Sequence, residues 1–272
     1  MSATRPLAVV TGASSGIGAV FARALAARGY DLMLVARRKD RLEQLARELE
    51  SAHGVASEVL AADLAAPAEL AGVERRISER SVDLLVNNAG FGSKGRFFEA
   101  PLDVQDQMHR VHVTATLRLT HAALAGMLAR RRGAIINVSS VAGFTQNPGS
   151  VSYCATKAWI NSFTEGLYLE LKTMGSPVRV QALCPGYTYS EFHDVIGWDR
   201  GHVAKWLWMS AESVVEASLQ GLERGRLFVV PGWQYRMMVF LARQIPRPIW
   251  HAAVLRASRR LGRVEGTGAV SG

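Results

Sequence analysis

The sequence is poor in cysteine and contains no long uncharged apolar run. Its two cysteines, Cys154 and Cys184, match neither a disulfide framework nor a metal-binding spacing, which favours a reducing compartment. The seven histidines are scattered as well, so no metal site is expected. Because no run of about 18 uncharged apolar residues occurs, no segment is expected to span a membrane. A strand is predicted from about Pro6 onward, which leaves no room for a signal peptide, and the expected location is cytoplasmic.

Acidic residues are missing from one long stretch near the carboxyl end. Residues 224–263 contain nine arginines, no lysine and no aspartate or glutamate. The whole chain carries 32 basic and 23 acidic residues and a net charge of +9, so this stretch accounts for the entire excess. The remaining residues are balanced in charge and show no nucleic-acid-binding motif. No nucleic-acid partner is therefore expected.

Most of this stretch is predicted to form a basic amphipathic helical extension, residues 233–263, followed by a flexible tail at 264–272. Apolar residues recur at near-helical spacing, and two prolines precede a second helix at about 249–261. Such helices can lie on an anionic membrane surface, which would make the protein membrane-peripheral. The alternative is that the apolar stripe packs against the domain or against another subunit of a homo-oligomer, as such stripes more often do. The residues concerned are Trp233, Met237, Phe240 and Leu241, with Arg236 and Arg243 beside them, and Pro246 and Pro248.

Predicted strands and helices alternate before the extension. With 49% hydrophobic residues, the chain can bury the core of one large domain, placed here at residues 1–232. The alternation predicts an α/β fold, with a doubly wound parallel sheet of the Rossmann type flanked by helices. Ligands bind such sheets at the carboxyl ends of the strands. The predicted strands are 7–10, 31–36, 55–62, 82–86, 134–138 and 178–183, with a strand-like run at 227–230.

A glycine-rich turn joins the first predicted strand to the helix that follows it. Glycines let backbone N–H groups approach a pyrophosphate, and the amino end of a helix favours its negative charge. A turn of this composition can also serve structure alone. The candidate cofactor-binding residues here are Gly12, Ser14, Ser15, Gly16, Ile17 and Gly18.

Two adjacent arginines, Arg37 and Arg38, follow the second predicted strand, where a dinucleotide-binding fold reads the adenosine ribose. An acid at this place would bind the 2′-hydroxyl of NAD, whereas guanidinium groups pair with a 2′-phosphate. The arginines can alternatively begin the surface helix predicted at 40–53. Two arginines without an acid favour NADP(H) as the cofactor.

Polar and small residues also follow the third and fourth strands. Asp63 and Leu64 close the third strand, where the carboxylate can bind an adenine amino group or cap the next helix. Asn88, Ala89 and Gly90 form a small turn after the fourth strand. This turn suits the close approach of a cofactor ribose, or it simply stabilises the sheet.

A candidate proton-transfer site lies between the fifth strand and the next helix. Ser140 follows the strand, and Tyr153 and Lys157 share one helical face at i and i+4. A lysine cation favours the phenolate of a neighbouring tyrosine, and a serine hydroxyl can hold a substrate oxygen beside it. Tyr168 and Lys172 repeat the spacing, but they lack an upstream serine and a nearby strand end, which is typical of an ordinary helix surface.

Together these motifs resemble those of the short-chain dehydrogenase/reductase family over about residues 5–232. The chain matches the family's TGxxxGIG, NAG and YxxxK motifs, its catalytic serine and its proline–glycine pair, Pro185-Gly186. The resemblance implies reversible hydride transfer between NADP(H) and a carbonyl or secondary alcohol. It also implies that Lys157 and Tyr153 contact the cofactor, that Thr188 holds the carboxamide, and that the protein forms dimers or tetramers.

One position departs from the family pattern. His112 stands in the middle of a long helix predicted at 102–130, where the resemblance implies an asparagine that helps a water relay protons from Lys157. An imidazole can also bond a water and carry protons, so His112 joins the catalytic candidates. If His112 is only a packed polar residue, turnover would be slow, and a cofactor-binding regulatory protein with little turnover is the alternative function.

A predicted substrate lid at about residues 190–210 is rich in aromatic side chains. Phe192, Trp198, Trp206 and Trp208 suit an apolar substrate such as a steroid, an acyl chain or a lipid ketone. The same aromatics can instead pack to close the domain.

Overall fold

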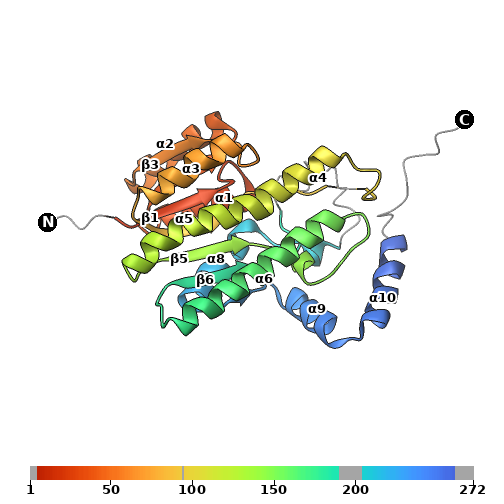
Figure 1. Ribbon diagram of the computed structural model, residues 1–272. Coiled ribbons are helices and arrows are strands. Elements are labelled where there is room, and N and C mark those ends of the chain that lie inside the picture. The colour runs from red at the N-terminus through yellow and green to blue at the C-terminus, as the bar shows by residue number, and fades with distance from the viewer. Residues whose placement is uncertain (1–4, 94, 190–203, 261–272) are drawn as a thin grey trace, which may run out of the picture.

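The computed structural model describes residues 5–93, 95–189 and 204–260. Within them, seven parallel strands form one sheet in the order β3-β2-β1-β4-β5-β6-β7, which confirms the predicted doubly wound fold (Figure 1). The strands are β1 (Leu7–Thr11), β2 (Asp31–Ala36), β3 (Ser57–Ala61), β4 (Val82–Asn87), β5 (Ala134–Val138), β6 (Arg179–Leu183) and β7 (Phe228–Val229).

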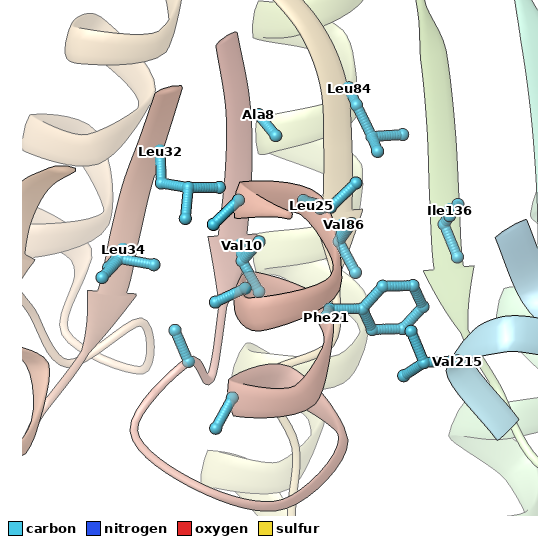
Figure 2. Packing of buried hydrophobic residues seen from close by; sticks show 14 of the residues in the cluster. Ala8, Val10, Phe21, Leu25, Leu32, Leu34, Leu84, Val86, Ile136 and Val215 are labelled. Atoms are coloured by element: carbon cyan, nitrogen blue, oxygen red, sulfur yellow. The ribbon is translucent and has the colours of Figure 1, made fainter. Parts of the chain in front are cut away.

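Helices cover both faces of this sheet. One face packs on α1 (Gly16–Ala26), α2 (Lys39–His53) and α8 (Ala211–Glu223), and the other on α3 (Pro67–Ser78), α5 (Thr116–Ala129) and α6 (Val151–Thr173). Successive side chains of a strand point to opposite faces, so the apolar runs of β1, β2 and β4 feed both cores. Figure 2 shows the first core, where strand residues such as Val10 and Val86 pack around Phe21 of α1 and Val215 of α8.

The strand order reverses between β1 and β4, because β2 and β3 lie on one side of β1 while β4 to β7 continue on the other. Loops that follow β1 and β4 therefore diverge and leave a crevice at the carboxyl edge of the sheet. In open α/β sheets, ligands bind at this switch point. The fold thus fixes where the predicted site residues can meet.

The long helix predicted at 102–130 is not a continuous α-helix. It consists of α4 (Leu102–His109), a π-helical segment (Arg110–Ala115) and α5. The apolar spacing correctly predicts that this stretch is helical throughout, but it does not predict the change of hydrogen-bond register inside the helix. Single π-helical turns are frequent at functional sites, and His112 lies within this one.

The predicted extension forms two helices, α9 (Trp233–Gln244) and α10 (Arg247–Arg260), which lie toward the carboxyl ends of the strands (Figure 1). The second helix begins two residues earlier than predicted because Pro248 is tolerated in a first helical turn. None of the described helices is long and apolar enough to cross a bilayer. Residues 261–272, which include the predicted tail, lie outside the described part of the chain.

Candidate active site

A cavity of about 770 Å³ lies at the carboxyl edge of the sheet and extends from the glycine turn to the start of α6. All but two of the predicted catalytic and cofactor-binding residues line it, and the exceptions are Gly18 and His112. Residues that are far apart in sequence are therefore brought to one site. The predicted residues that line the cavity are Gly12, Ser14, Ser15, Gly16, Ile17, Arg37, Arg38, Asp63, Leu64, Asn88, Ala89, Gly90, Ser140, Tyr153, Lys157, Pro185, Gly186 and Thr188.

Ser140 and Tyr153 meet at the inner end of this cavity. Ser140 follows β5 and begins a tight turn in which its Oγ accepts the N–H of Ala142 at 3.1 Å and donates to the carbonyl of Pro185 at 3.4 Å. The hydroxyl of Ser140 also hydrogen-bonds the Tyr153 phenol. A serine and a phenol fixed in this way can hold one oxygen atom of a substrate between them.

Lys157 lies one helical turn beyond Tyr153, as the i, i+4 spacing predicts. Its Nζ donates to the carbonyl of Val138 at 2.8 Å and lies 5.6 Å from the centre of the Tyr153 ring. The ammonium is buried, and burial lowers the pKa of Lys157 to about 8. Lys157 is thus mostly charged at neutral pH but loses its proton within the range of ordinary assays.

The pKa of the Tyr153 phenol corrects one expectation from the sequence. Burial raises this pKa to about 12, and the hydrogen bond with Ser140 opposes the rise without cancelling it. In this structure the Lys157 cation therefore does not bring the phenol toward ionisation at neutral pH. Tyr153 is a protonated group there, suited to giving a proton to an oxygen that gains negative charge.

The pair Tyr168 and Lys172 shows what spacing alone achieves. The Nζ of Lys172 lies 5.4 Å from the centre of the Tyr168 ring, almost the same distance as between Lys157 and Tyr153. Lys172 is exposed, however, and neither residue lines the cavity. The strand end and the serine, which the sequence supplied for Tyr153 alone, distinguish the site from the helix surface.

The glycine turn is held in place by Thr11 of β1 and by the turn that follows β4. Asn88 Nδ2 donates to the carbonyl of Thr11 at 2.9 Å, and Thr11 Oγ1 accepts the backbone N–H of Asn88 at 2.9 Å and of Ala89 at 3.0 Å. Gly18 is buried below the turn, where a β-carbon would lie 2.3 Å from the carbonyl oxygen of Gly12. Gly18 thus permits close packing of α1 on β1. Thr11, which fixes the turn, is a residue that the sequence analysis did not assign to the site.

Arg38 leans over this turn from the carboxyl end of β2. Its guanidinium donates to Ser15 Oγ at 2.8 Å and to Ser14 Oγ at 3.1 Å, while Arg37 is exposed at the mouth of the same cavity. Asp63 follows β3, the strand next to β2, and its Oδ1 accepts the N–H of Ala65 at 2.9 Å, so the carboxylate organises its own loop. This end of the cavity presents two guanidinium groups and two hydroxyl groups, a donor set that suits a phosphate.

His112 is fully buried beneath the cavity, and both ring nitrogens are used within the protein. Nε2 accepts the N–H of Phe91 at 3.1 Å, which assigns the proton to Nδ1, and Nδ1 donates to Thr156 Oγ1 at 2.9 Å. Burial holds the pKa of His112 well below its usual value, and the charges of Lys157 and His109 act in the same direction. In this arrangement the ring is neutral and offers no free nitrogen to a water. His112 therefore acts as a packed polar residue here and is poorly placed to carry protons.

The carboxyl-terminal extension also builds the site, which sequence reasoning did not foresee. Tyr235 of α9 accepts the N–H of Tyr187 at 2.9 Å and donates to the carbonyl of Leu207 at 2.6 Å. From α10, Trp250, Val254 and neighbouring small residues line the cavity. The sequence analysis drew attention to the apolar stripe of this extension, but none of the stripe residues lines the cavity.

The predicted substrate lid is described only in part. Phe192 and Trp198 fall within residues 190–203, outside the described residues. Trp208 is buried, and its ring stacks on Tyr189 at 4.9 Å between centres, whereas Trp206 is exposed. No metal-binding cluster of His, Cys, Asp or Glu occurs among the residues that the structure describes.

Comparison with known proteins agrees with this geometry. The short chain dehydrogenase profile matches residues 6–200, so the chain belongs to the short-chain dehydrogenase/reductase family of oxidoreductases. A very-long-chain 3-oxoacyl-CoA reductase from Anas platyrhynchos is 34% identical over 193 residues, which cover 69% of this chain and 61% of that protein. The chain therefore spans less than two thirds of that relative's length.

Two solved structures extend the likeness over almost the whole chain. A short-chain dehydrogenase from Sphingobium yanoikuyae in complex with NADPH is 35% identical, with a TM-score of 0.79 over 98% of this chain and 99% of that chain. A bulky-bulky ketone specific alcohol dehydrogenase from Comamonas testosteroni is 31% identical, with a TM-score of 0.75 and 97% coverage of both chains. The extension formed by α9 and α10 thus falls within the length that these structures share.

Proposed function

We propose that this protein is an NADP(H)-dependent oxidoreductase that interconverts a bulky apolar ketone and its secondary alcohol. The observation that carries the proposal is the single cavity that joins Arg38 and the glycine turn at one end to Ser140 and Tyr153 at the other. One end has the chemistry to bind a phosphorylated nucleotide, and the other has the chemistry to move a proton to or from oxygen. A dinucleotide cofactor needs both within one continuous space.

The donor set at the nucleotide end fits the phosphorylated form of this cofactor. Arg37 and Arg38 can pair with a 2′-phosphate, and no acid stands at the end of β2 to receive a 2′-hydroxyl. Gly12, at a φ of +67°, and Gly16, at +54°, allow the turn to present its backbone to a pyrophosphate. The relative from Sphingobium yanoikuyae, solved with NADPH, supports the same choice.

The residues at the other end supply positioning and proton transfer. When bound, the cofactor supplies a hydride to the substrate carbon, or accepts one from it. Ser140 and Tyr153 hold the substrate oxygen, and the Tyr153 phenol gives that oxygen its proton as the carbonyl becomes an alcohol. The resulting phenolate is stabilised by the nearby Lys157 ammonium. Alcohol oxidation runs through the same contacts in reverse.

The substrate end of the cavity is largely apolar. Phe91, Val111, Met238, Trp250 and Val254 line it, and each is a side chain without a charge. Such a lining suits a bulky apolar substrate, oriented by the few polar groups at the reacting end. The names of two relatives, a very-long-chain 3-oxoacyl-CoA reductase and a bulky-bulky ketone specific alcohol dehydrogenase, point to substrates of this kind.

Steady-state assays with NADPH, NADH and a panel of apolar ketones test this function, with loss of reduced-nicotinamide absorbance as the measurement. Tyr153→Phe is expected to lower kcat by about 10²- to 10⁴-fold, because the phenolic proton is removed. Tyr168→Phe is the matched control and should leave kcat unchanged. NADPH binding without turnover of any ketone or alcohol would instead favour a cofactor-binding regulatory protein, for which the closed bonding of His112 is the structural hint.

A further inference from the structure

Helix α9 has one face on the domain and one face in solvent. Tyr235 and Val239 are buried against the body of the protein. At about 100° per residue, the opposite side of the helix carries four apolar side chains with high exposure. These are Trp233 (68% exposed), Phe240 (58%), Met237 (51%) and Leu241 (41%), and they are called the α9 face below.

Packing on the domain cannot account for the α9 face, because the helix already docks through its other side. The sequence left open whether this apolar stripe covers the domain, and the structure assigns that role to Tyr235 and Val239 instead. Helix α10 adds two more exposed apolar side chains, Ile249 at 62% and Leu255 at 51%. Contiguous exposed apolar residues on a surface of this kind mark an interaction site.

Arginine side chains border the α9 face. Arg236 and Arg243 lie along one edge of the helix, and Arg224 and Arg226 precede β7. These four guanidinium groups line a groove of about 600 Å³ between α8, β7 and α9, in which Arg243 lies 5.0 Å from the ring centre of Phe144. Within the described residues, none of the four is paired with a carboxylate in an ion pair.

We propose that the α9 face binds the surface of a bilayer that contains anionic lipids, with the four arginines receiving the lipid phosphates. A helix that lies in such an interface buries aromatic and aliphatic side chains at the acyl boundary and places arginines at the headgroups. Trp233 and Phe240 supply the first group, and Arg236 and Arg243 at the edge supply the second. The absence of any acid from residues 224–263 removes repulsion from the anionic surface.

A second copy of the chain is a poorer occupant of the same face. A two-fold contact brings a surface patch against itself, so the arginines of one subunit would face those of the other without an acid from this stretch to neutralise them. Like charges brought together across an interface cost affinity. An anionic bilayer complements both the charge and the apolar side chains of this surface.

Co-sedimentation of the full chain with phosphatidylcholine vesicles, with and without phosphatidylserine, tests the proposal. Binding is expected only with phosphatidylserine at about 0.1 M salt, and it should weaken strongly at about 1 M salt, where charges are screened within a few ångströms. The double variant Trp233→Ser, Phe240→Ser should lower the partition coefficient by at least about tenfold. Arg236→Gln and Arg243→Gln should each lower it by about fivefold.

Matched controls separate the face from general surface properties. Leu169→Ser, on the exposed side of α6, and Arg75→Gln, on α3, should leave vesicle binding unchanged. Thermal unfolding and ketone reduction confirm that the α9 variants fold. Equal binding by the α9 variants and the wild type, or no binding to phosphatidylserine vesicles at all, overturns the proposal. A dimer in sedimentation velocity that Trp233→Ser dissociates would assign the face to a second copy instead.

Discussion

Gly186 lies flat against the ring of Tyr235, and a β-carbon on this glycine would sit 2.0 Å from the ring carbon Cζ. The contact joins the loop after β6, which lines the cofactor end of the cavity, to a helix of the extension more than 40 residues later. The tyrosine hydroxyl completes the junction through its bonds to Tyr187 and Leu207. The extension is therefore a structural part of the catalytic domain and not an appendage to it.

This junction predicts the effect of Tyr235→Phe. The substitution keeps the ring against Gly186 but leaves the N–H of Tyr187 and the carbonyl of Leu207 without their partner. We expect unfolding free energy to fall by about 1–3 kcal/mol and the Kd for NADP(H) to rise, because the loop after β6 is held less firmly. Thermal unfolding and cofactor titration measure both effects, with Tyr168→Phe as the control. Unchanged cofactor affinity would show that the junction serves stability alone.

The arginines at the end of β2 predict cofactor choice. Arg37→Asp should raise the Kd for NADPH far more than that for NADH, because the carboxylate repels a 2′-phosphate but accepts a 2′-hydroxyl. Arg38→Ala should weaken the binding of both cofactors, since Arg38 also donates hydrogen bonds to Ser14 and Ser15 of the glycine turn. Lys39→Ala is the matched control, because Lys39 is exposed, lies outside the cavity lining and pairs with Glu43. If Arg37→Asp raised the Kd for NADPH and for NADH by the same factor, a role for Arg37 in binding the 2′-phosphate would be refuted.

Burial of Lys157 predicts a pH-dependent stability difference from Lys157→Met. The folded pKa is about 8, below the ordinary 10.5, so between these values the unfolded chain binds more protons than the folded one. Wild-type stability therefore gains from this group as pH rises through that window, by up to roughly 3 kcal/mol. The variant lacks this gain, so denaturant unfolding of both proteins at pH 7 and pH 10 should show the wild type improving relative to the variant. A constant difference would mean that the pKa of the folded amine is not lowered, as for a well-solvated lysine.

The bonding of His112 predicts what His112→Asn would change. The shorter side chain leaves the N–H of Phe91 and the hydroxyl of Thr156 without the imidazole, which should cost about 1–3 kcal/mol of unfolding free energy. Because the ring is already neutral, the pH profile of kcat/KM should have the same limbs in both proteins between pH 6 and 8. An ionisation near the ordinary histidine value that disappears in the variant would instead give His112 a part in proton transfer.

Much of the sheet and its site could be predicted from local pattern. Apolar runs gave the bounds of β2 and β5 without error, and β1 and β4 to within one residue, because a strand buried on both faces is continuously apolar. The glycine turn, the two arginines and the Ser140–Tyr153–Lys157 group all follow strand ends, and parallel strands bring their ends to one edge. The parallel topology therefore brings these residues, which are far apart along the chain, to one site.

Other properties depend on neighbours that no local pattern identifies. The pKa of Tyr153 is set mainly by burial, whereas the sequence shows only the nearby lysine. The bonding of His112 depends on Phe91 and Thr156, which are 21 and 44 residues away along the chain. The apolar spacing of α9 marked a helix with an apolar side, but the residues that dock it, Tyr235 and Val239, lie on the opposite side from those that first drew attention.

The π-helical segment at Arg110–Ala115 limits how this protein can tolerate changes in length. Each π-helical turn holds more residues than an α-helical turn, so the segment sets the rotation of α4 relative to α5. Deleting one residue there would allow a regular α-helix to form and would keep α4 close to its present rotation, whereas deleting one residue between this segment and Leu119 of α5 would rotate α4 by about 100° against the rest of α5. Gln107 and Val111, which line the cavity, would then turn away while the core contacts of Leu119 stayed in place. The π-helical segment is thus the part of this helix that can absorb the loss of one residue, whereas the same loss at the start of α5 would turn cavity residues away from the site.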